Sequence, residues 1–208
     1  MPLLALDAPS SAVTTMSRHR RPPRGTPSGA QVEGLTTEYP KSVLAGRRSV
    51  RRFGDRTVPV EELTDVLGTA EGAQRRQWPA GRHGDPGLTL MAAAYRVDGL
   101  PGALHVWCRE TAAFDPGGNP EWLRRLPAWF AAAPALVLVC GSINRADRIA
   151  YGQLLVQAGA LGYEIWLAAR SRGLECSVYG NAIHEASGAL APGGRHLFTV
   201  ALGYAVEV

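Results

Sequence analysis

The chain has 208 residues, of which 46% are hydrophobic, and it carries 22 Lys and Arg side chains against 18 Asp and Glu. This length is enough to bury one sizeable core, and the formal net charge of +4 is too small for a general nucleic-acid binder. The three cysteines, Cys108, Cys140 and Cys176, are far apart, lie in apolar surroundings and form no CxxC pair. They predict reduced core thiols of a cytoplasmic protein, without a zinc site.

The first 38 residues differ in composition from the rest of the chain. They are rich in Pro, Ser, Thr and Gly, with a basic cluster between Arg18 and Arg24 and no sustained apolar period. A secretory signal places its charges before the apolar run, whereas here the short "LLAL" precedes them. We therefore expect a disordered leader in residues 1–38 and one folded domain in residues 39–208.

The folded part is predicted to begin with a short helix in "YPKSVLAGR", because Pro40 suits a first helical turn and Gly46 a helix end. The stretch "VPVEELTDVLGTAEG" predicts a second helix that starts after Pro59. Its apolar face is formed by Leu63, Val66, Leu67 and Ala70. Residues 73–90, rich in Gly, Arg, Pro and Gln, predict a loop.

Two short strands are predicted in "AAYRV" and "ALHVWCR", joined by the turn "DGLPG". The following "NPEWLRRLPAWFAA" predicts a helix with a break at Pro127. A central strand is expected in "PALVLVCGS", because a continuous apolar run is typical of a strand that is buried on both faces.

The longest predicted helix runs from Asp147 to Gly173 and is apolar or small on nearly every side, which is typical of a buried helix. It is not a membrane span, since Arg148 and Glu164 bracket too short an uncharged stretch. Glycines 159 and 162 lower helix propensity, so they indicate the close approach of another helix or of a flat ligand.

After this helix, "LECSVY" predicts a strand, "NAIHEASGAL" a short helix capped by Asn181, and "RHLFTVALGY" a final strand. Helices and strands alternate around a hairpin-like pair in the middle of the chain. The expected class is therefore α+β, with helices on both faces of one mostly antiparallel sheet.

Several common catalytic motifs are absent. The sequence has neither a G-x-x-x-x-G-K-[ST] nor a G-x-G-x-x-G phosphate loop. "HEASG" at His184 lacks the second histidine of a zinc protease, and "CGSIN" is not the G-x-S-x-G elbow of a hydrolase. Since the five histidines are scattered, we expect no metal site.

The basic segment "GRRSVRRF" remains as the candidate binding site. Guanidinium groups and a hydroxyl placed just after a helix can hold a phosphate monoester, and Arg47, Arg48, Ser49 and Arg51 supply them. Taken alone, the same segment is more typical of a solvated basic loop than of a phosphate site.

The surrounding motifs extend this interpretation. "RRSVRRF" followed by "VPVEELTDVLGTAEG" resembles the N-terminal signature of the nitroreductase-like flavoproteins, in which an R-x-S-x-R segment grips the FMN phosphate. "VDGLPGALHVW", "YGQLLVQAGALGYEIWLAARSRGLECSVYG" and "LFTVALGY" resemble the hairpin, central helix and closing strand of the SagB-type branch. Members of that branch are dehydrogenases that turn azolines into azoles in ribosomal peptides. The resemblance spans roughly residues 39–204.

Applied residue by residue, this resemblance implies that Arg47, Arg48, Ser49 and Arg51 bind the phosphate and ribityl side of FMN. The stretch Val178, Tyr179 and Gly180 would face the flavin ring through its backbone. Tyr151 would be the catalytic tyrosine of a Lys-Tyr pair. Plain structural roles stay open, because Ser49 can cap a turn, Tyr151 can open the long helix and Gly180 can permit a turn.

The sequence also departs from the family pattern. The lysine position of the Lys-Tyr pair is Ala150, and Asp85 in "GDPGL" occupies the place of a serine in the loop that lies against the flavin. The chain stops soon after "ALGY" without the basic residue that often completes the phosphate grip. These departures put the reaction in doubt more than the fold.

The resemblance implies an FMN-dependent oxidoreductase that acts on a peptide or related natural-product intermediate. It also implies a homodimer with residues 151–172 near the interface, alone or within a heteromeric biosynthetic complex, and with no nucleic acid or membrane as partner. Two alternatives remain. One is a catalytically silent subunit that binds a partner enzyme or peptide, and the other is an NAD(P)H-dependent reductase of small nitro compounds or quinones.

Overall fold

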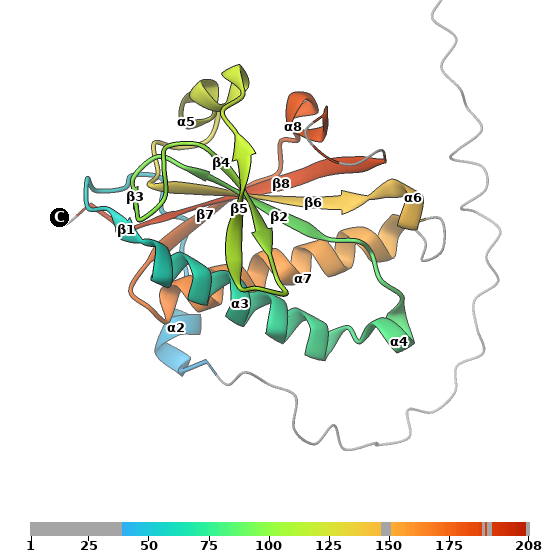
Figure 1. Cartoon of the computed structure of the whole chain (residues 1–208). Coiled ribbons are helices and arrows are strands. Elements are labelled where there is room, and N and C mark those ends of the chain that lie inside the picture. Colours follow the sequence, from blue (N-terminus) through green and yellow to red (C-terminus); the bar gives the residue numbers. More distant parts are fainter. Residues whose placement is uncertain (1–38, 147–150, 189, 191–192, 207–208) are drawn as a thin grey trace, which may run out of the picture. The chain divides into compact units, whose positions relative to one another are not determined.

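A six-stranded antiparallel sheet organises the residues that the computed structural model describes, namely 39–146, 151–188, 190 and 193–206 (Figure 1). The strand order is β5-β4-β2-β6-β8-β7. The strands are β2 (Thr89–Ala94), β4 (Leu104–Cys108), β5 (Ala113–Gly118), β6 (Ala135–Ser142), β7 (Glu175–Tyr179) and β8 (Gly194–Gly203). A separate parallel pair joins β1 (Val58–Pro59) to β3 (Val97–Asp98).

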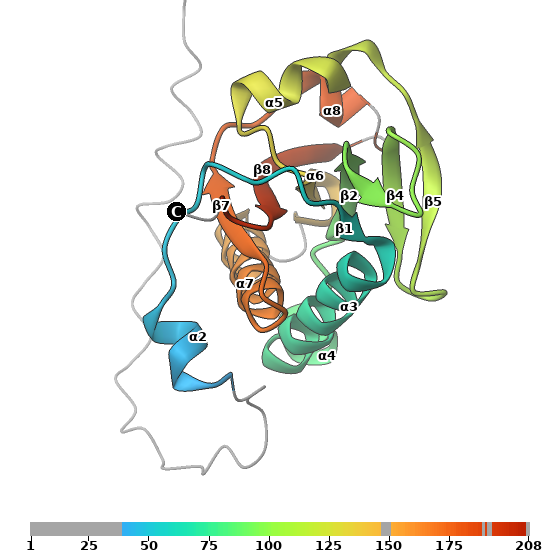
Figure 2. The same ribbon diagram turned by 90° about the vertical axis from the view of Figure 1, so that its left-hand side faces the viewer.

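Helices cover both faces of this sheet, as Figures 1 and 2 show. The pair α3 (Val60–Gln77) and α7 (Tyr151–Arg170) lies against one face. The short helices η2 (Glu121–Arg125), α5 (Leu126–Trp129) and α8 (His184–Gly188) lie against the other. Three more short helices are α2 (Lys41–Ala45), α4 (Ala80–His83) and α6 (Ile143–Ala146). The predicted α+β class with helices on both faces is confirmed.

The apolar run predicted as a central strand is β6, which lies between β2 and β8. Its residues alternate between two cores. Val137 and Val139 pack on the side of α3 and α7, whereas Leu136 and Leu138 pack on the side of α5 and α8. Because both faces of the strand are covered by helices, no polar alternation appears in its sequence.

Helix α3 extends further than the sequence predicted. Its predicted apolar face is buried, but the helix continues to Gln77, and α4 follows soon after, so the interpretation of residues 73–90 as a loop was wrong over its first half. The added turn consists of good helix formers and is anchored by Gln74, whose Nε2 donates to Oε1 of Gln157 on α7 at 3.3 Å.

Helix α7 is buried along one side only, which corrects the expectation of burial all round. Leu154, Leu161 and Ile165 face the sheet and are at most 1% exposed. In contrast, Leu155 is 44% and Val156 is 54% exposed. The predicted helix start at residues 147–150, including Ala150, lies outside the described residues, as does the predicted leader.

Three smaller expectations were also wrong. Helix α8 begins at His184, three residues after its predicted cap Asn181. Cys108 is partly exposed at the end of β4, where its Sγ lies 3.6 Å from Oε2 of Glu110. Cys140 and Cys176 are core thiols, as expected. Burial raises the pKa of the Cys140 thiol to about 12. Strand β5 was not predicted at all.

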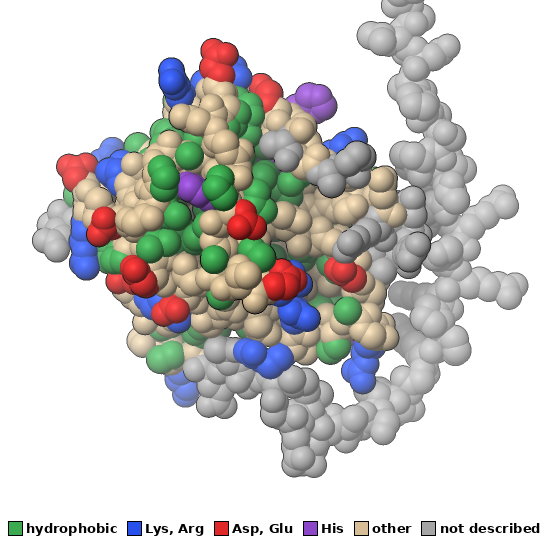
Figure 3. All heavy atoms as spheres, in the orientation of Figure 1, with side chains coloured by type: hydrophobic (Ala, Val, Ile, Leu, Met, Phe, Trp, Pro, Cys, Tyr) green, Lys and Arg blue, Asp and Glu red, His purple; other side chains and the backbone are tan. Residues whose placement is uncertain are grey.

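Charges of both signs are interspersed over the face shown in Figure 3, without a field of one sign. This agrees with the small net charge of the chain. Among the described helices, none combines the length and the apolar character needed to cross a membrane. Nor do the described residues contain a cluster of three or more His, Cys, Asp or Glu side chains placed to hold a metal ion.

Candidate functional site

A groove of about 390 Å³ lies between the exposed side of α7 and the strands β7 and β8. Its walls are almost entirely apolar side chains and glycine backbone. They are formed by Gly159, Gly162, Tyr163, Trp166, Val178, Gly180, Leu197 and Phe198. A wall of this kind suits a flat apolar ligand or a second protein surface.

Gly159 and Gly162, the two glycines of α7 that line the groove, have different structural reasons. A Cβ atom at Gly162 would meet the ring of Phe198 at 2.6 Å, so this glycine is required by the protein's own packing. A Cβ atom at Gly159 would meet nothing within 4 Å. The close approach that the sequence predicted is therefore made at Gly162 by an internal aromatic ring, while Gly159 leaves the floor of the groove open.

Arg47 is the residue of the basic segment that reaches this groove. Its guanidinium carbon lies 4.8 Å from the ring centre of Trp166 and 5.5 Å from that of Tyr163. Both distances are typical of cation–π contacts, which fix the guanidinium over the two aromatic rings. A permanent positive charge thus stands beside an otherwise apolar groove.

The rest of the basic segment follows the free edge of the sheet. The backbone N–H of Val50 donates to the carbonyl oxygen of Cys176 in β7 at 2.9 Å, which holds the segment along this edge strand. Arg48, Ser49 and Arg51 are exposed around this anchor. Their side chains are therefore accessible to a ligand that lies between the segment and the groove.

The predicted ring-facing stretch divides between the two sides of β7. Val178 and Gly180 line the groove. The ring of Tyr179 lies on the other face of the sheet, with its centre 5.4 Å from that of Phe130. Since the carbonyl of Cys176 points to the free edge, the alternation of an antiparallel strand directs the N–H of Val178 to the same edge. Only a backbone role is therefore compatible with Tyr179.

Tyr151, the predicted catalytic residue, lies at the first position of α7 and is 52% exposed. It precedes Gly159 by about two turns, or about 12 Å along the helix axis. Tyr151 lies outside the groove lining, so one chain does not bring this side chain together with the predicted phosphate-binding residues.

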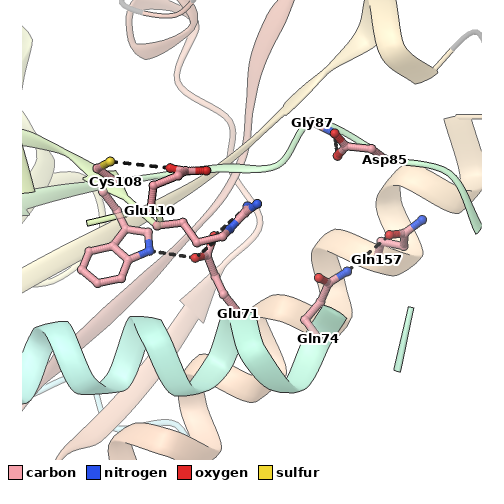
Figure 4. A network of polar contacts seen from close by, with 9 residues as sticks. Glu71, Gln74, Asp85, Gly87, Cys108, Glu110 and Gln157 are labelled. Carbon is pink, nitrogen blue, oxygen red and sulfur yellow. Dashed lines mark hydrogen bonds and ion pairs between the residues drawn. The ribbon is translucent and has the colours of Figure 1, made fainter. Parts of the chain in front are cut away.

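Asp85 is folded back onto its own loop, as Figure 4 shows. Its Oδ1 accepts a hydrogen bond of 2.8 Å from the backbone N–H of Gly87. The loop lies beside Arg109, and the charge of Asp85 contributes to raising the pKa of that guanidinium, although hydrogen bonds to Glu71 are the main cause. The carboxylate is thus stabilised by its own loop and a neighbouring cation.

Sequence reasoning missed the aromatic side of the groove. Tyr163, Trp166 and Phe198 were interpreted only as parts of a helix and a strand. The spacing was a usable signal, because Tyr163 follows Gly159 by four residues and Trp166 follows Tyr163 by three, and residues three and four apart share one face of a helix. Trp166 is 7% exposed, and its Nε1 has no hydrogen-bond partner among the described residues.

No model of a known protein family matches this sequence, and no curated protein matches it. Solved structures do match. A protein from Ralstonia eutropha assigned as a nitroreductase has a TM-score of 0.66 at 18% identity, over 85% of this chain and 88% of its own. The E. coli microcin synthetase McbBCD complex with truncated pro-MccB17 bound has a TM-score of 0.61 at 14% identity, over 99% and 85%.

A protein from Anabaena variabilis assigned as a nitroreductase is similar over 78% of this chain, with a TM-score of 0.62 at 18% identity. The present chain spans only 37% of that protein's length. Sequence identities this low show a similarity of fold and not of substrate or reaction. The sheet order, the helices on both faces and these matches together establish that the described part of the chain has a nitroreductase-like fold.

Proposed function

We propose that this protein is an FMN-dependent oxidoreductase that acts on a peptide or related natural-product intermediate. The observation that carries the proposal is the position of Arg47, whose guanidinium is fixed over Trp166 and Tyr163 beside the apolar groove. An anionic phosphate next to a flat aromatic ring system is the ligand chemistry that this combination matches.

The residues present fit the group. Gly159 and Gly180 leave room beside the groove, since a Cβ at either position would meet nothing within 4 Å. The unpaired Nε1 of Trp166 offers a buried hydrogen-bond donor next to Arg47. Bound FMN would supply the two-electron redox chemistry, while the chain would hold the phosphate, orient the ring and exclude water.

A homodimer is part of this proposal. Tyr151, Leu155, Val156 and Tyr163 are each between 44% and 54% exposed along one side of α7, and Val178 of β7 is 39% exposed. A stripe of large apolar side chains is costly in water, and a symmetric partner would cover it. The same partner would close the open side of the groove.

A catalytically silent subunit is the second candidate, and the position of Tyr151 favours it. Within one chain this tyrosine lies about two helical turns from the groove floor. Unless a second subunit completes the site, no described acid or base of the predicted set reaches the groove.

Flavin uptake followed by anaerobic reduction separates the candidates. The full-length protein is purified, incubated with FMN and desalted, and its visible absorbance is recorded; heat release then identifies the bound flavin. We expect a yellow protein whose absorbance bleaches on mixing with an azoline-containing peptide. Bleaching only with NAD(P)H supports the small-molecule reductase instead. Protein that stays colourless after incubation with excess FMN contradicts the flavin site and supports the silent subunit.

A further inference from the structure

A polar cleft of about 440 Å³ lies on the other flank of α7, between α3, α4 and the loop before β2. At 100° per residue, Gln157 points about 160° away from Gly159, so helix α7 separates this cleft from the apolar groove. The cleft shares Asp85 and Arg109 with a smaller pocket of about 250 Å³ beside it. Its volume is within the range of small-molecule sites.

Gln157 forms the inner end of the cleft and is fully buried. Its Oε1 accepts a hydrogen bond from Nε2 of Gln74, and the two side chains point toward each other in Figure 4. Its own Nε2 has no partner among the described residues. A buried donor without an acceptor lowers stability, so its presence indicates a ligand that supplies the acceptor.

Arg109 is oriented at the outer end of the same cleft. Its Nε and Nη2 each donate to a carboxylate oxygen of Glu71 at 3.2 Å, and Nε1 of Trp107 donates to Glu71 at 2.8 Å. Glu71 is thereby fully engaged and holds the guanidinium plane in one orientation. The guanidinium of Arg109 also lines the cleft, where it offers further N–H donors to a ligand.

The lining of the cleft is cationic and partly aromatic. Among the described residues that line it, three are arginines (Arg75, Arg76 and Arg109) and one is a carboxylate, Asp85, which accepts from the N–H of Gly87. Trp78 adds an apolar wall, held by its edge-to-face contact with His83 at 5.0 Å. Donors and positive charge thus converge on an aromatic surface.

We propose that this cleft binds a ligand with a carboxylate group, which accepts from Nε2 of Gln157 and from the cleft arginines while its apolar part packs on Trp78. The carboxylate belongs either to a small organic acid or to the C-terminus of a peptide. Neither source depends on flavin binding, since the cleft and the groove lie on different flanks of α7.

The test uses nuclear magnetic resonance of the full-length protein, with the indole N–H of Trp78 as the reporter and Trp78→Phe to assign it. The probes are benzoate, a small acid, and hippurate, whose acylglycine end mimics a peptide C-terminus; benzamide and hippuramide are their neutral counterparts. For fragments of this size a Kd on the order of 10 mM is expected. We expect saturable shifts with the acids and at least tenfold weaker binding of the amides. The stronger of the two acids identifies the source.

Gln157→Leu should weaken acid binding at least tenfold, because it removes the donor that contacts the carboxylate. It removes one unpaired donor but leaves Nε2 of Gln74 without its acceptor, so circular dichroism must first show that the variant is folded. Gln157→Glu should abolish binding of the acids by charge repulsion. The matched control is Gln153→Leu, one turn earlier on α7, whose side chain instead donates to the carbonyl oxygen of His83 at 2.8 Å. It should bind the acids as the wild type does.

Three results would overturn the proposal. The first is the absence of a saturable shift of the Trp78 signal with either acid. The second is unchanged acid binding in Gln157→Leu. The third is saturation by inorganic phosphate at lower concentration than by either acid, which would assign the cleft to a different anion.

Discussion

Replacing Arg47 by alanine is the most direct test of the proposed flavin site. The guanidinium of Arg47 is held 4.8 Å above Trp166 at the edge of the groove. A charge-assisted contact to a dianionic phosphate is worth about 1.5–3 kcal/mol. Since about 1.4 kcal/mol corresponds to a factor of ten, Arg47→Ala should weaken FMN binding by about tenfold or more.

Arg56→Ala provides a matched control from the same basic stretch. The guanidinium carbon of Arg56 lies 3.8 Å from the ring centre of Tyr204, away from the groove. Each substitution removes one positive charge, and Arg47→Ala removes two cation–π contacts where Arg56→Ala removes one, each worth about 0.5–1 kcal/mol of stability. The melting temperatures of the two variants should therefore differ little, while their affinities for FMN should differ clearly.

The affinity for FMN is measured by titrating FMN fluorescence with the wild type and with each variant, after circular dichroism has shown that each protein is folded. Arg47→Lys separates charge from shape, because it keeps the charge and loses the planar group that stacks on Trp166. The FMN affinity of Arg47→Lys should be intermediate between those of the wild type and Arg47→Ala. Equal losses of FMN affinity in Arg47→Ala and Arg56→Ala would refute the assignment, since a general effect of charge would then explain both.

Three further outcomes are expected. Gly162→Ala should lower the free energy of unfolding by about 1 kcal/mol or more, because the added methyl group meets Phe198. Gly159→Ala should raise it by up to about 1 kcal/mol, because alanine has the higher helix propensity and nothing lies within 4 Å of its methyl group. Chemical denaturation measures both changes, and a change of the same sign in both variants would contradict the packing described. Leu155→Arg should convert a dimer to a monomer in light scattering, and a monomeric wild type would disprove the interface. Burial lowers the pKa of His196 in the folded state, so the unfolded state binds more protons as the pH drops from 7 towards 5. The melting temperature of the wild type should therefore fall over this range, and that of His196→Gln should fall less.

The sequence was a good guide where one residue pattern determined one element. The apolar run of β6 and the period of α3 predicted their elements because both follow directly from what a core-facing strand or helix must bury. Strand β5 contradicts its own propensities, since it contains Asp115, Pro116 and two glycines. Its pairing with β4 overrides them, and pairing is a property of the folded chain.

The candidate site was predictable only in part. Arg47 was found from a local motif, but its contact with Trp166 joins segments that are far apart in the sequence. Gln74 and Gln157 carried no signal, because glutamine in a helix ordinarily faces solvent. Their burial arises from the packing of α3 on α7, which no local pattern encodes.

The two outer strands of the sheet are protected in different ways. An uncovered edge strand offers its backbone to the strands of other molecules and promotes aggregation. On β5 the proline and the aspartate discourage such pairing. On β7 the basic segment itself covers the edge, because the backbone N–H of Val50 donates a hydrogen bond to the carbonyl oxygen of Cys176. The residues proposed to recognise a ligand thus also prevent this strand from templating intermolecular sheets, so a substitution that displaces the segment endangers solubility together with binding.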